Sequence, residues 1–368
     1  MSRVQRGKPD FVFIAVLAAL TFAGFFIFIS ASLGFLARGG SLFGTAILKQ
    51  LLLGLVLGGG CSLAASFTYY ERWRTYSPWL FLGALALTAL VFVPGIGFEH
   101  GGARRWIIVG PLSFQPAEFL KFALILYAAA WLAALPQRGR TLPFAMLPVL
   151  IMLAAAGILL ALQPNISTLL IIVAAIVSMC IAHGARIRDL ALLLGLGLIG
   201  VALLVMVRPY LYERIKTFID PSHDALGASY QIQQSLIAVG SGGIFGRGFG
   251  QSVQKFQYLP EPIGDSIFAV AAEEFGFIGA LTLIMLFLAL ALRGFRIAAH
   301  APDNFSALLV TGFITLIVTQ SFMNIGAMLG VIPLTGTPLI FVSKGGSALL
   351  FALAEAGIII NVSRFARG

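Results

Sequence analysis

Long apolar runs constrain this chain more than any other feature of its sequence. Of its 368 residues, 59% are hydrophobic and 10% are charged, whereas a soluble domain carries about 25% charged residues. Apolar runs of about 18 residues or more predict membrane-spanning helices. They are too long for the alternating strands of a membrane β-barrel. We therefore expect an all-α integral membrane protein that forms one polytopic domain over residues 1–368.

Ten transmembrane helices are predicted from these runs. The first run begins at Phe11 and is too long for the apolar core of a cleaved signal peptide, so it counts as a span. The predicted spans are 11–35, 47–68, 77–95, 116–135, 143–162, 166–183, 189–207, 266–292, 305–331 and 346–363.

Basic residues predict the orientation of these spans. With the N-terminus in the cytoplasm, every inner segment carries at least two Lys or Arg residues, as the positive-inside rule expects, and both termini are cytoplasmic. These 13 of the 24 basic residues are Arg3, Arg6, Lys8, Arg72, Arg74, Arg138, Arg140, Arg186, Arg188, Arg293, Arg296, Arg364 and Arg367. Most others lie in or beside two outer segments, 96–115 and 208–265. There, loop solubility and an anionic ligand are both open explanations.

The segment 208–265, between the seventh and eighth spans, is predicted to be one long outer loop. A loop of this length in a compact domain is usually functional. It opens with an amphipathic, helix-like stretch at 208–221 and then carries seven glycines between Gly240 and Gly264. Glycine lets backbone N–H groups approach a ligand closely. The spacing of these glycines matches neither a P-loop nor a dinucleotide fingerprint, which argues against nucleotide binding.

Cysteine and histidine do not predict a metal centre. The two cysteines lie inside apolar runs, and no Cys/His cluster has the spacing of a zinc site. We therefore expect no nucleotide, haem or zinc cofactor, and no nucleic-acid partner.

Five motifs follow one another along the chain from about residue 100. They are GARRWIIVGPLSFQPAEFLK (102–121), LQPNISTLL (162–170), GASYQIQQSLIAVGSGGIFGRGFGQSVQKFQYLPE (227–261), DSIFAVAAEEFGFIG (265–279) and NIGAMLGVIPLTGTPLIFVSKGGSALL (324–350). Their wording and order resemble the SEDS family (shape, elongation, division and sporulation), which comprises the FtsW, RodA and SpoVE proteins.

The chain departs from the family pattern at several positions. Asn165 stands where the family has Asp, and Lys344 stands where it has Tyr. The family's HTD reads IGD at 263–265, so only its Asp is kept, as Asp265. Asn165 puts a carboxylate role at that position in doubt.

The resemblance implies a peptidoglycan glycosyltransferase. Family members polymerise lipid II, an undecaprenyl-diphosphate-linked disaccharide pentapeptide, at the outer face of the bacterial cytoplasmic membrane. It further implies a class B penicillin-binding protein and other divisome or elongasome membrane proteins as partners, and a divalent cation (Mg or Mn) with ligands that stay unknown. Within the family we favour an FtsW-like division enzyme at the septum. Division against elongation, and the preferred stem peptide, stay open.

The reaction that the resemblance implies joins a sugar hydroxyl to an anomeric carbon and releases a lipid diphosphate, so it needs a base and positive charge. Asp265, at the outer boundary of the eighth span, is the predicted general base, although an Asp there is also a favoured helix N-cap. Glu261 lies four residues earlier; in a helical turn it would share a face with Asp265, and could then share a cation with it or raise its pKa. A solvated loop glutamate is an equally open interpretation of Glu261. Predicted substrate-binding residues are Arg104, Arg105, Lys121, Arg214, Lys216, Arg247, Lys255, Glu261 and Lys344.

Other polar residues are predicted to be structural or to line the cavity. Glu273 and Glu274 lie eight and nine residues past Asp265, about 12–14 Å deeper, where we expect them to pair with buried polar groups. Glu118 and Lys121 are three apart on the fourth span, so mutual pairing and substrate binding are both open. The full set is Glu118, Gln163, Glu273, Glu274, Asn324, Ser343 and Ser347.

Three alternatives to a transferase remain at this stage. A lipid II flippase would also have many spans and an anionic-lipid cavity, but it needs no base at the outer boundary. A non-catalytic scaffold for a class B penicillin-binding protein needs neither Asp265 nor the basic loop. An O-antigen ligase or polymerase shares the lipid-diphosphate chemistry, but the five motifs favour SEDS.

Overall fold

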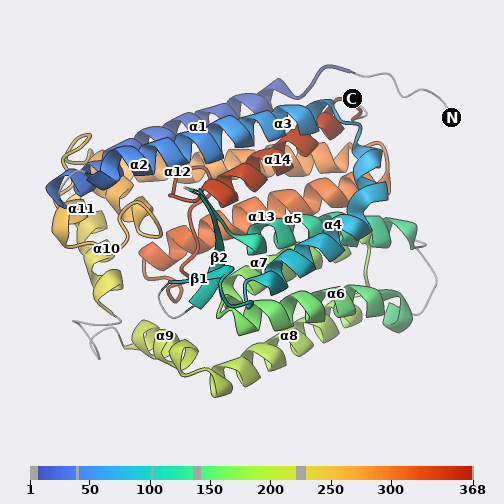
Figure 1. The fold of residues 1–368 in the computed structure, drawn as a ribbon. Coiled ribbons are helices and arrows are strands. Elements are labelled where there is room, and N and C mark those ends of the chain that lie inside the picture. Colours follow the sequence, from blue (N-terminus) through green and yellow to red (C-terminus); the bar gives the residue numbers. More distant parts are fainter. Residues whose placement is uncertain are drawn as a thin grey trace.

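The computed structural model is a bundle of long helices that lie side by side (Figure 1). It describes residues 7–38, 41–100, 103–110, 112–135, 142–220 and 229–366. Of the basic residues used above for orientation, Arg3, Arg6, Arg138, Arg140 and Arg367 lie outside these described residues, as does the part of the predicted loop at 221–228.

Seven of the described helical units are long and apolar enough to cross a membrane. They are α1 with the 3-10 turn η1 (Phe11–Ser32 and Leu33–Arg38), the rod formed by α2, the π-helix η2 and α3 (Ser41–Lys49, Gln50–Leu57 and Gly58–Phe67), α5 (Pro116–Ala134), α7 (Ile166–His183), α12 (Ile267–Ala299), α13 (Asn304–Met328) and α14 (Gly346–Ser363). Helices α4 (Tyr70–Leu90), α6 (Leu142–Leu162) and α8 (Ile187–Val207) overlap the other three predicted spans.

The core of the bundle lies on α5, α13 and α14. Between 67% and 72% of their most apolar stretches are buried, against 33% for α1 and 22% for the α2–α3 rod. Figure 1 shows α5, α13 and α14 between α1 and α3 on one side and α6 and α8 on the other. The apolar outer faces of α1 and of the α2–α3 rod are what lipid would cover.

The segment between α4 and α5 corrects the all-α prediction. It forms an antiparallel sheet of β1 (Gly97–His100), β2 (Ala103–Val109) and β3 (Leu112–Phe114), in the order β1-β2-β3. The β2 sequence ends in Trp-Ile-Ile-Val, and aromatic and β-branched residues favour strands. The overall composition hid this short local signal.

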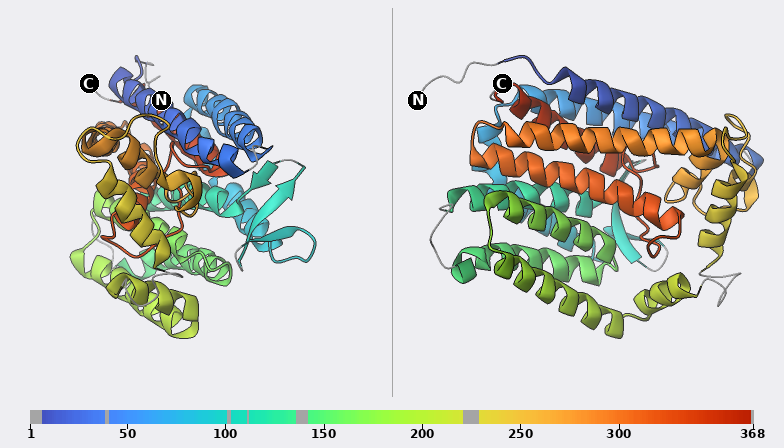
Figure 2. Two further views of the ribbon diagram at one scale, coloured as in Figure 1. Left: turned by 90° about the vertical axis from the view of Figure 1, so that its left-hand side faces the viewer. Right: turned by 180° about the vertical axis from the view of Figure 1, so that it is seen from behind.

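The segment 208–265 is more structured than a single loop. The helix predicted at its start is confirmed as α9 (Pro209–Ile219), and α10 (Tyr230–Ser241) and the short α11 (Gln254–Gln257) follow. Figure 2 shows α9, α10 and α11 at one end of the bundle.

Helix α12 is broken at Gly276, and the glycine-rich segment 242–250 fills the break. Gly276 has φ 66° and ψ −166°, which interrupts the helical hydrogen bonds. The carbonyls of Glu273 and Glu274 accept instead from the backbone N–H groups of Arg247 (3.0 Å) and Gly248 (2.9 Å).

The backbone N–H groups that follow the break also find hydrogen-bond partners in the segment 242–250. The N–H groups of Phe277 and Ile278 donate to the carbonyls of Gly243 (2.9 Å) and Ile244 (3.2 Å). Irregular backbone at membrane depth is tolerated only where its polar groups find partners in the protein. The segment 242–250 is therefore built into the bundle, although the sequence predicts an outer loop there.

This exchange requires glycine at two positions. A Cβ on Gly246 would lie 2.1 Å from the Glu274 carbonyl oxygen, and a Cβ on Gly276 would lie 2.3 Å from the Gly246 nitrogen. Both glycines have positive φ, which side chains disfavour.

We expect Gly246→Ala and Gly276→Ala each to destabilise the fold by about 1–3 kcal/mol, because a methyl group at either position forces the segment out of the break. Thermal unfolding of the detergent-solubilised protein measures this. Gly240→Ala is the matched control, because Gly240 lies in α10 with nothing within 4 Å of its added Cβ. Equal melting temperatures for the three variants would contradict this account of the break.

Candidate functional site

Asp265 lies just before α12, in a turn whose backbone is held from two other parts of the chain. Asn324 of α13 donates its Nδ2 to the Asp265 carbonyl (2.8 Å). Ser343 donates to the Gly264 carbonyl (2.8 Å), and the Lys344 backbone N–H donates to the Ile263 carbonyl (2.6 Å). Asp265 is therefore fixed by its backbone, and its side chain does not need to cap the helix.

The turn itself is closed by Glu261. Its carbonyl accepts from the N–H groups of Gly264 (2.9 Å) and Ser266 (3.3 Å), and its φ of 46° is unusual for a residue with a side chain. The Glu261 side chain is exposed. This local strain brings the Glu261 and Asp265 carboxylates to the same turn, as the four-residue spacing suggested.

Two arginines lie near the Asp265 carboxylate. A Cβ on Gly336 would lie 3.4 Å from Arg214 Nη2 and 3.7 Å from Asp265 Oδ2, so the two side chains flank Gly336. The pKa of Asp265 is raised to about 6: burial and the Glu261 carboxylate raise it, and the Arg214 and Arg105 guanidinium groups partly oppose these two effects. Asp265 is thus a half-buried carboxylate of raised basicity beside positive charge.

Backbone carbonyls hold both arginines in place. Arg214, on α9, donates Nη1 to the Leu334 carbonyl (2.9 Å). Arg105, on β2, donates Nε to the Gln163 carbonyl (3.0 Å) and Nη2 to the Pro164 carbonyl. The sheet and α9 therefore bring two distant basic residues to Asp265.

Three unpartnered polar atoms belong to residues that take part in these hydrogen bonds or lie next to them in the chain. Among the described residues, Gln163 Oε1, Asn165 Nδ2 and Asn324 Oδ1 are buried with no hydrogen-bond partner. Such groups are rare in native structures and often await a ligand or water. Asn165 was noted in the sequence only as a departure from the family Asp, and its side-chain amide adds a buried donor to this region.

Three further residues predicted to bind substrate are Arg104, Lys216 and Lys344. Arg104 is exposed and pairs with Glu99 across the sheet (Nε to Oε2, 3.1 Å). Lys216 is half-buried on α9, and the Lys344 side chain is exposed. Of these three, the structure gives none a contact with Asp265.

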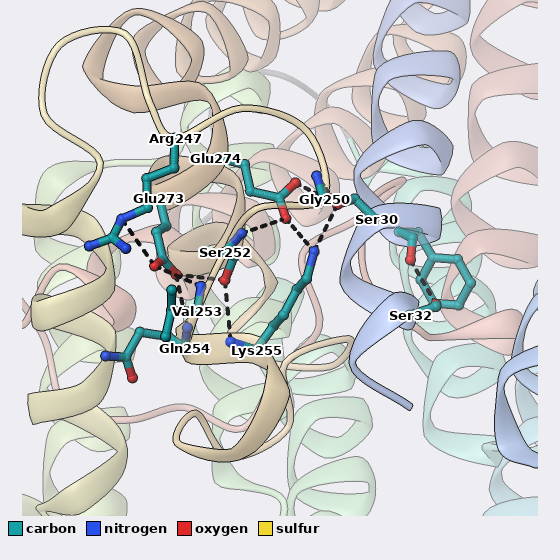
Figure 3. Close-up of polar contacts among 11 residues, drawn as sticks. Ser30, Ser32, Arg247, Gly250, Ser252, Val253, Gln254, Lys255, Glu273 and Glu274 are labelled. Atoms are coloured by element: carbon teal, nitrogen blue, oxygen red, sulfur yellow. Dashed lines mark hydrogen bonds and ion pairs between the residues drawn. The ribbon is translucent and has the colours of Figure 1, made fainter. Parts of the chain in front are cut away.

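Lys255 and Glu274 form a buried ion pair (Figure 3), in which Lys255 Nζ lies 2.6 Å from Glu274 Oε1 and both side chains are fully enclosed. Ser30 of α1 donates to Glu274 Oε2 (2.5 Å) and accepts from Lys255 Nζ (3.2 Å). Lys255 was predicted to contact the diphosphate, but this enclosed ammonium instead ties its segment to α1 and α12.

Glu273 holds the same segment from the other side (Figure 3). It accepts from Ser252 Oγ (2.6 Å) and from the backbone N–H groups of Val253 (3.0 Å) and Gln254 (3.3 Å). Arg247, also predicted to bind substrate, lies 3.5 Å from Glu273 Oε1 and is 42% exposed. The structure thus places both glutamates in a buried polar network.

A second buried cluster lies on α5, α13 and α14. Lys121 Nζ contacts Glu118 Oε2 (2.8 Å) and donates to Gln320 Oε1 (2.5 Å). Lys121 was predicted to bind substrate, but it is 4% exposed and is held by this pair. Glu355 of α14 was not identified from the sequence; it lines a small cavity together with Glu118, Lys121 and Gln320. A carboxylate inside an apolar run was the signal that would have found it.

Two remaining predicted residues join elements. Ser347 accepts from the Gln115 N–H (3.1 Å) and donates to the Ser113 carbonyl (3.3 Å), which links α14 to the sheet. Gln163 donates Nε2 to the Thr88 carbonyl (3.0 Å). Within the described ranges, no three or more His, Cys, Asp or Glu side chains are grouped to hold a metal ion.

Known proteins resemble this chain over nearly its full length. The family model described as "Cell cycle protein", for FtsW, RodA and SpoVE, matches residues 10–368. Stage V sporulation protein E of Bacillus subtilis (strain 168) is 42% identical over 298 residues, which cover 81% of each chain. The probable peptidoglycan glycosyltransferase FtsW of Trichlorobacter lovleyi is 37% identical over 357 residues, 96% of this chain and 93% of the relative.

Solved structures show the same fold. A chain of a peptidoglycan synthase complex that coordinates polymerization and crosslinking has a TM-score of 0.78 and 29% identity, and the match covers 97% of this chain and 98% of the other. The rod shape determining protein RodA of Thermus thermophilus has a TM-score of 0.70 and 28% identity, with 97% of each chain covered. The chain therefore belongs to the SEDS family of FtsW, RodA and SpoVE proteins.

Proposed function

We propose that this protein is a peptidoglycan glycosyltransferase that polymerises lipid II, with Asp265 as its general base. The observation that carries the proposal is a carboxylate of raised basicity held beside two arginines, because this is the combination that glycosyl transfer from a lipid diphosphate requires. Relatives named as probable peptidoglycan glycosyltransferases support it. So does the structural similarity to a peptidoglycan synthase complex.

The transfer proceeds by one displacement. Asp265 accepts the proton of the attacking sugar hydroxyl while the hydroxyl oxygen bonds to the anomeric carbon of the second lipid II. The bond from that carbon to the phosphate oxygen breaks, and the diphosphate leaves with its electron pair. Arg214 and Arg105 offset the negative charge that develops on the leaving group. A pKa near 6 keeps Asp265 ionised at pH 7 and makes it a stronger base than an ordinary aspartate.

A divalent cation fits this site as a partner of the substrate. Mg²⁺ is commonly bound by one or two carboxylates together with substrate phosphates, and the turn offers two carboxylates, Glu261 and Asp265. A bound Mg²⁺ or Mn²⁺ would supply positive charge at the diphosphate. The protein's own contribution is to place two carboxylates and two arginines at one turn.

The placement of charges supports an outer-face site. Asp265 precedes α12, and Arg293 and Arg296 lie 28 and 31 positions further along the chain, near the end of this helix. At about 1.5 Å per residue on either side of the break at Gly276, that is roughly 40 Å, enough to cross the hydrocarbon core of a bilayer. Basic residues favour the cytoplasmic side. We infer ten spans, cytoplasmic termini and an active site at the outer face of the bacterial inner membrane.

The same reasoning extends to partners and role. The similar chain in a synthase complex that coordinates polymerization and crosslinking supports a class B penicillin-binding protein as the crosslinking partner. The higher identity to proteins named SpoVE and FtsW than to RodA supports a division-type enzyme at the septum. Localisation of a fluorescent fusion to midcell rather than the sidewall tests this assignment.

Replacing Asp265 by Asn tests the general base. We expect Asp265→Asn to lower the rate of polymerisation at least about 100-fold, because the amide cannot accept the proton. Labelled lipid II, Mg²⁺ or Mn²⁺ and the cognate penicillin-binding protein provide the assay. Glu99→Gln, which removes an exposed carboxylate from the sheet, is the control and should stay active. If Asp265→Asn polymerises lipid II at the wild-type rate, Asp265 is not the general base. If the wild-type protein moves lipid II across vesicle membranes without polymerising it, the flippase alternative is favoured.

The raised pKa of Asp265 predicts how the rate depends on pH. The pKa is raised from 3.8 to about 6, and the base acts only when deprotonated. We expect kcat/KM to increase about tenfold per pH unit below pH 6 and to level off above it. A profile that is already flat at pH 5 would contradict the raised pKa.

The same pKa predicts how stability depends on pH. Because the folded pKa lies above the unfolded value, the contribution of Asp265 to stability is present below about pH 4 and is lost as pH rises through 6. Because Asn does not ionise, the Asp265→Asn variant does not lose stability in this way as the pH rises. Its melting temperature should therefore match wild type at pH 4 and exceed it at pH 8.

Replacing Lys255 tests whether its side chain forms a structural ion pair or contacts the substrate. Lys255→Met leaves Glu274 buried without its cation, so we expect a loss of about 3–5 kcal/mol, with a large part recovered in the double variant Lys255→Met/Glu274→Gln. Thermal unfolding reports both changes, and the exposed Lys344→Met is the matched control. A stable Lys255→Met protein that binds lipid II weakly would restore Lys255 to the substrate site.

A further inference from the structure

Glu355 is a buried carboxyl group at the middle of the membrane-spanning helix α14. It is the tenth of the 18 residues from Gly346 to Ser363 and is 4% exposed. Within the part of the chain that the structure describes, it makes no hydrogen bond and no ion pair within 4 Å. An ionised carboxylate in this position would be uncompensated in a region of low polarity.

Glu355 lines a small cavity together with the Glu118–Lys121 pair of α5 and Gln320 of α13. The rest of the lining is apolar and comes from α13, α14 and the segment before α14. The cavity has room for about one water molecule. It is therefore a small cavity lined by both charged and apolar side chains.

Within the described ranges, Lys121 is the one basic group that acts on the charge of Glu355. Helix α13 and the neighbouring α1, η2 and α3 carry no Asp, Glu, Lys, Arg or His. The charged residues at the start of α4, Glu71, Arg72 and Arg74, are exposed. On α12, Glu273 and Glu274 are engaged by the segment 252–255, Arg293 pairs with Asp10, and Arg296 is exposed. Among the described residues, Glu118 and Lys121 are therefore the charged groups that line the cavity with Glu355.

The charges in this cluster do not balance if both glutamates are ionised. Lys121 is 2.8 Å from Glu118 and donates to Gln320 at 2.5 Å, so one ammonium faces two carboxyl groups. Either a proton or a small cation would restore neutrality. A cation in a one-water cavity would lie against the Lys121 ammonium, and the described residues offer no group of three acidic or histidine ligands. A proton needs no extra space.

We propose that Glu355 is a proton-binding site inside the membrane bundle, where its neutral carboxyl group shares the one-water cavity with the Glu118–Lys121 pair. The proton makes the cluster neutral overall and leaves the ammonium to Glu118 and Gln320. This assignment concerns α5, α13 and α14 and does not depend on the proposed function.

The cluster is connected to the backbone around Asp265. Gln320 donates Nε2 to the Pro338 carbonyl (3.1 Å). One turn further along α13, Asn324 donates to both the Thr337 and the Asp265 carbonyls (2.8 Å each). Without its proton, the Glu355 carboxylate would attract the Lys121 ammonium away from Gln320. Protonation of Glu355 therefore favours the arrangement in which α13 is hydrogen-bonded to the segment 334–345.

Infrared spectroscopy of the full-length protein in nanodiscs tests the proposal directly. The difference spectrum of wild type minus Glu355→Gln at pH 7 should contain the carbonyl stretch of a protonated carboxylic acid, shifted in D₂O. A spectrum in which Glu355→Gln removes only carboxylate bands would overturn the proposal.

Thermal unfolding gives an independent measurement. Glu355→Gln is nearly isosteric with the protonated side chain, so its melting temperature at pH 7 should match wild type, whereas Glu118→Gln removes the partner of Lys121 and should melt several degrees lower. As the pH is raised, wild type should lose stability relative to Glu355→Gln. Equal destabilisation by Glu355→Gln and Glu118→Gln would identify Glu355 as a charged partner of Lys121 and reject the proton site.

Salt composition separates a proton from a cation. We expect equal melting temperatures for wild type in sodium chloride and in choline chloride. A stabilisation by sodium that Glu355→Gln abolishes would show that the cavity binds Na⁺, and the proposal would fail.

Discussion

Every peptide group inside a membrane needs a hydrogen-bond partner, and the break in α12 at Gly276 meets this requirement by exchange with the segment 242–250. Four backbone hydrogen bonds cross the break, and they satisfy the two carbonyl and two N–H groups that would have bonded to each other in a continuous helix. Only glycine fits where the two backbones meet, at Gly246 and Gly276. The turn that carries Asp265 lies between this segment and the first part of α12.

Two buried glutamates extend the junction into a fixed platform. Glu273 accepts from the backbone that follows the glycine-rich segment, and Glu274 pairs with Lys255 and Ser30. These contacts fold the chain back toward α1 before it enters the turn at 258–266. Asp265 therefore follows a segment that is held by several hydrogen bonds and an ion pair, which would help to keep the proposed general base in position.

The positions of the helices could be predicted from the sequence better than the surroundings of the lysines. Hydropathy is a local property, so the helices could be located from runs of residues. Lys255 and Lys121 are predicted as substrate contacts because a basic residue in a predicted outer segment, or within a motif, is expected to be accessible to an anionic ligand. Their enclosure depends on partners such as Ser30, 225 positions from Lys255, and such distant pairings leave no local pattern. The sheet at 97–114 was hidden because its strands are short and lie between long apolar runs.

The buried acidic groups of this protein differ in what surrounds each carboxyl group. Glu274 has an ammonium and a hydroxyl within hydrogen-bond distance, so its charge is compensated and its role is to hold a segment. Asp265 has guanidinium groups nearby but also a second carboxylate, Glu261, so it stays ionised at neutral pH yet accepts protons readily. Glu355 shares a single ammonium with Glu118, and this shortage of positive charge is what calls for a proton. The position of each carboxylate relative to basic side chains, more than its depth, decides whether it supports the fold, performs chemistry or binds a proton.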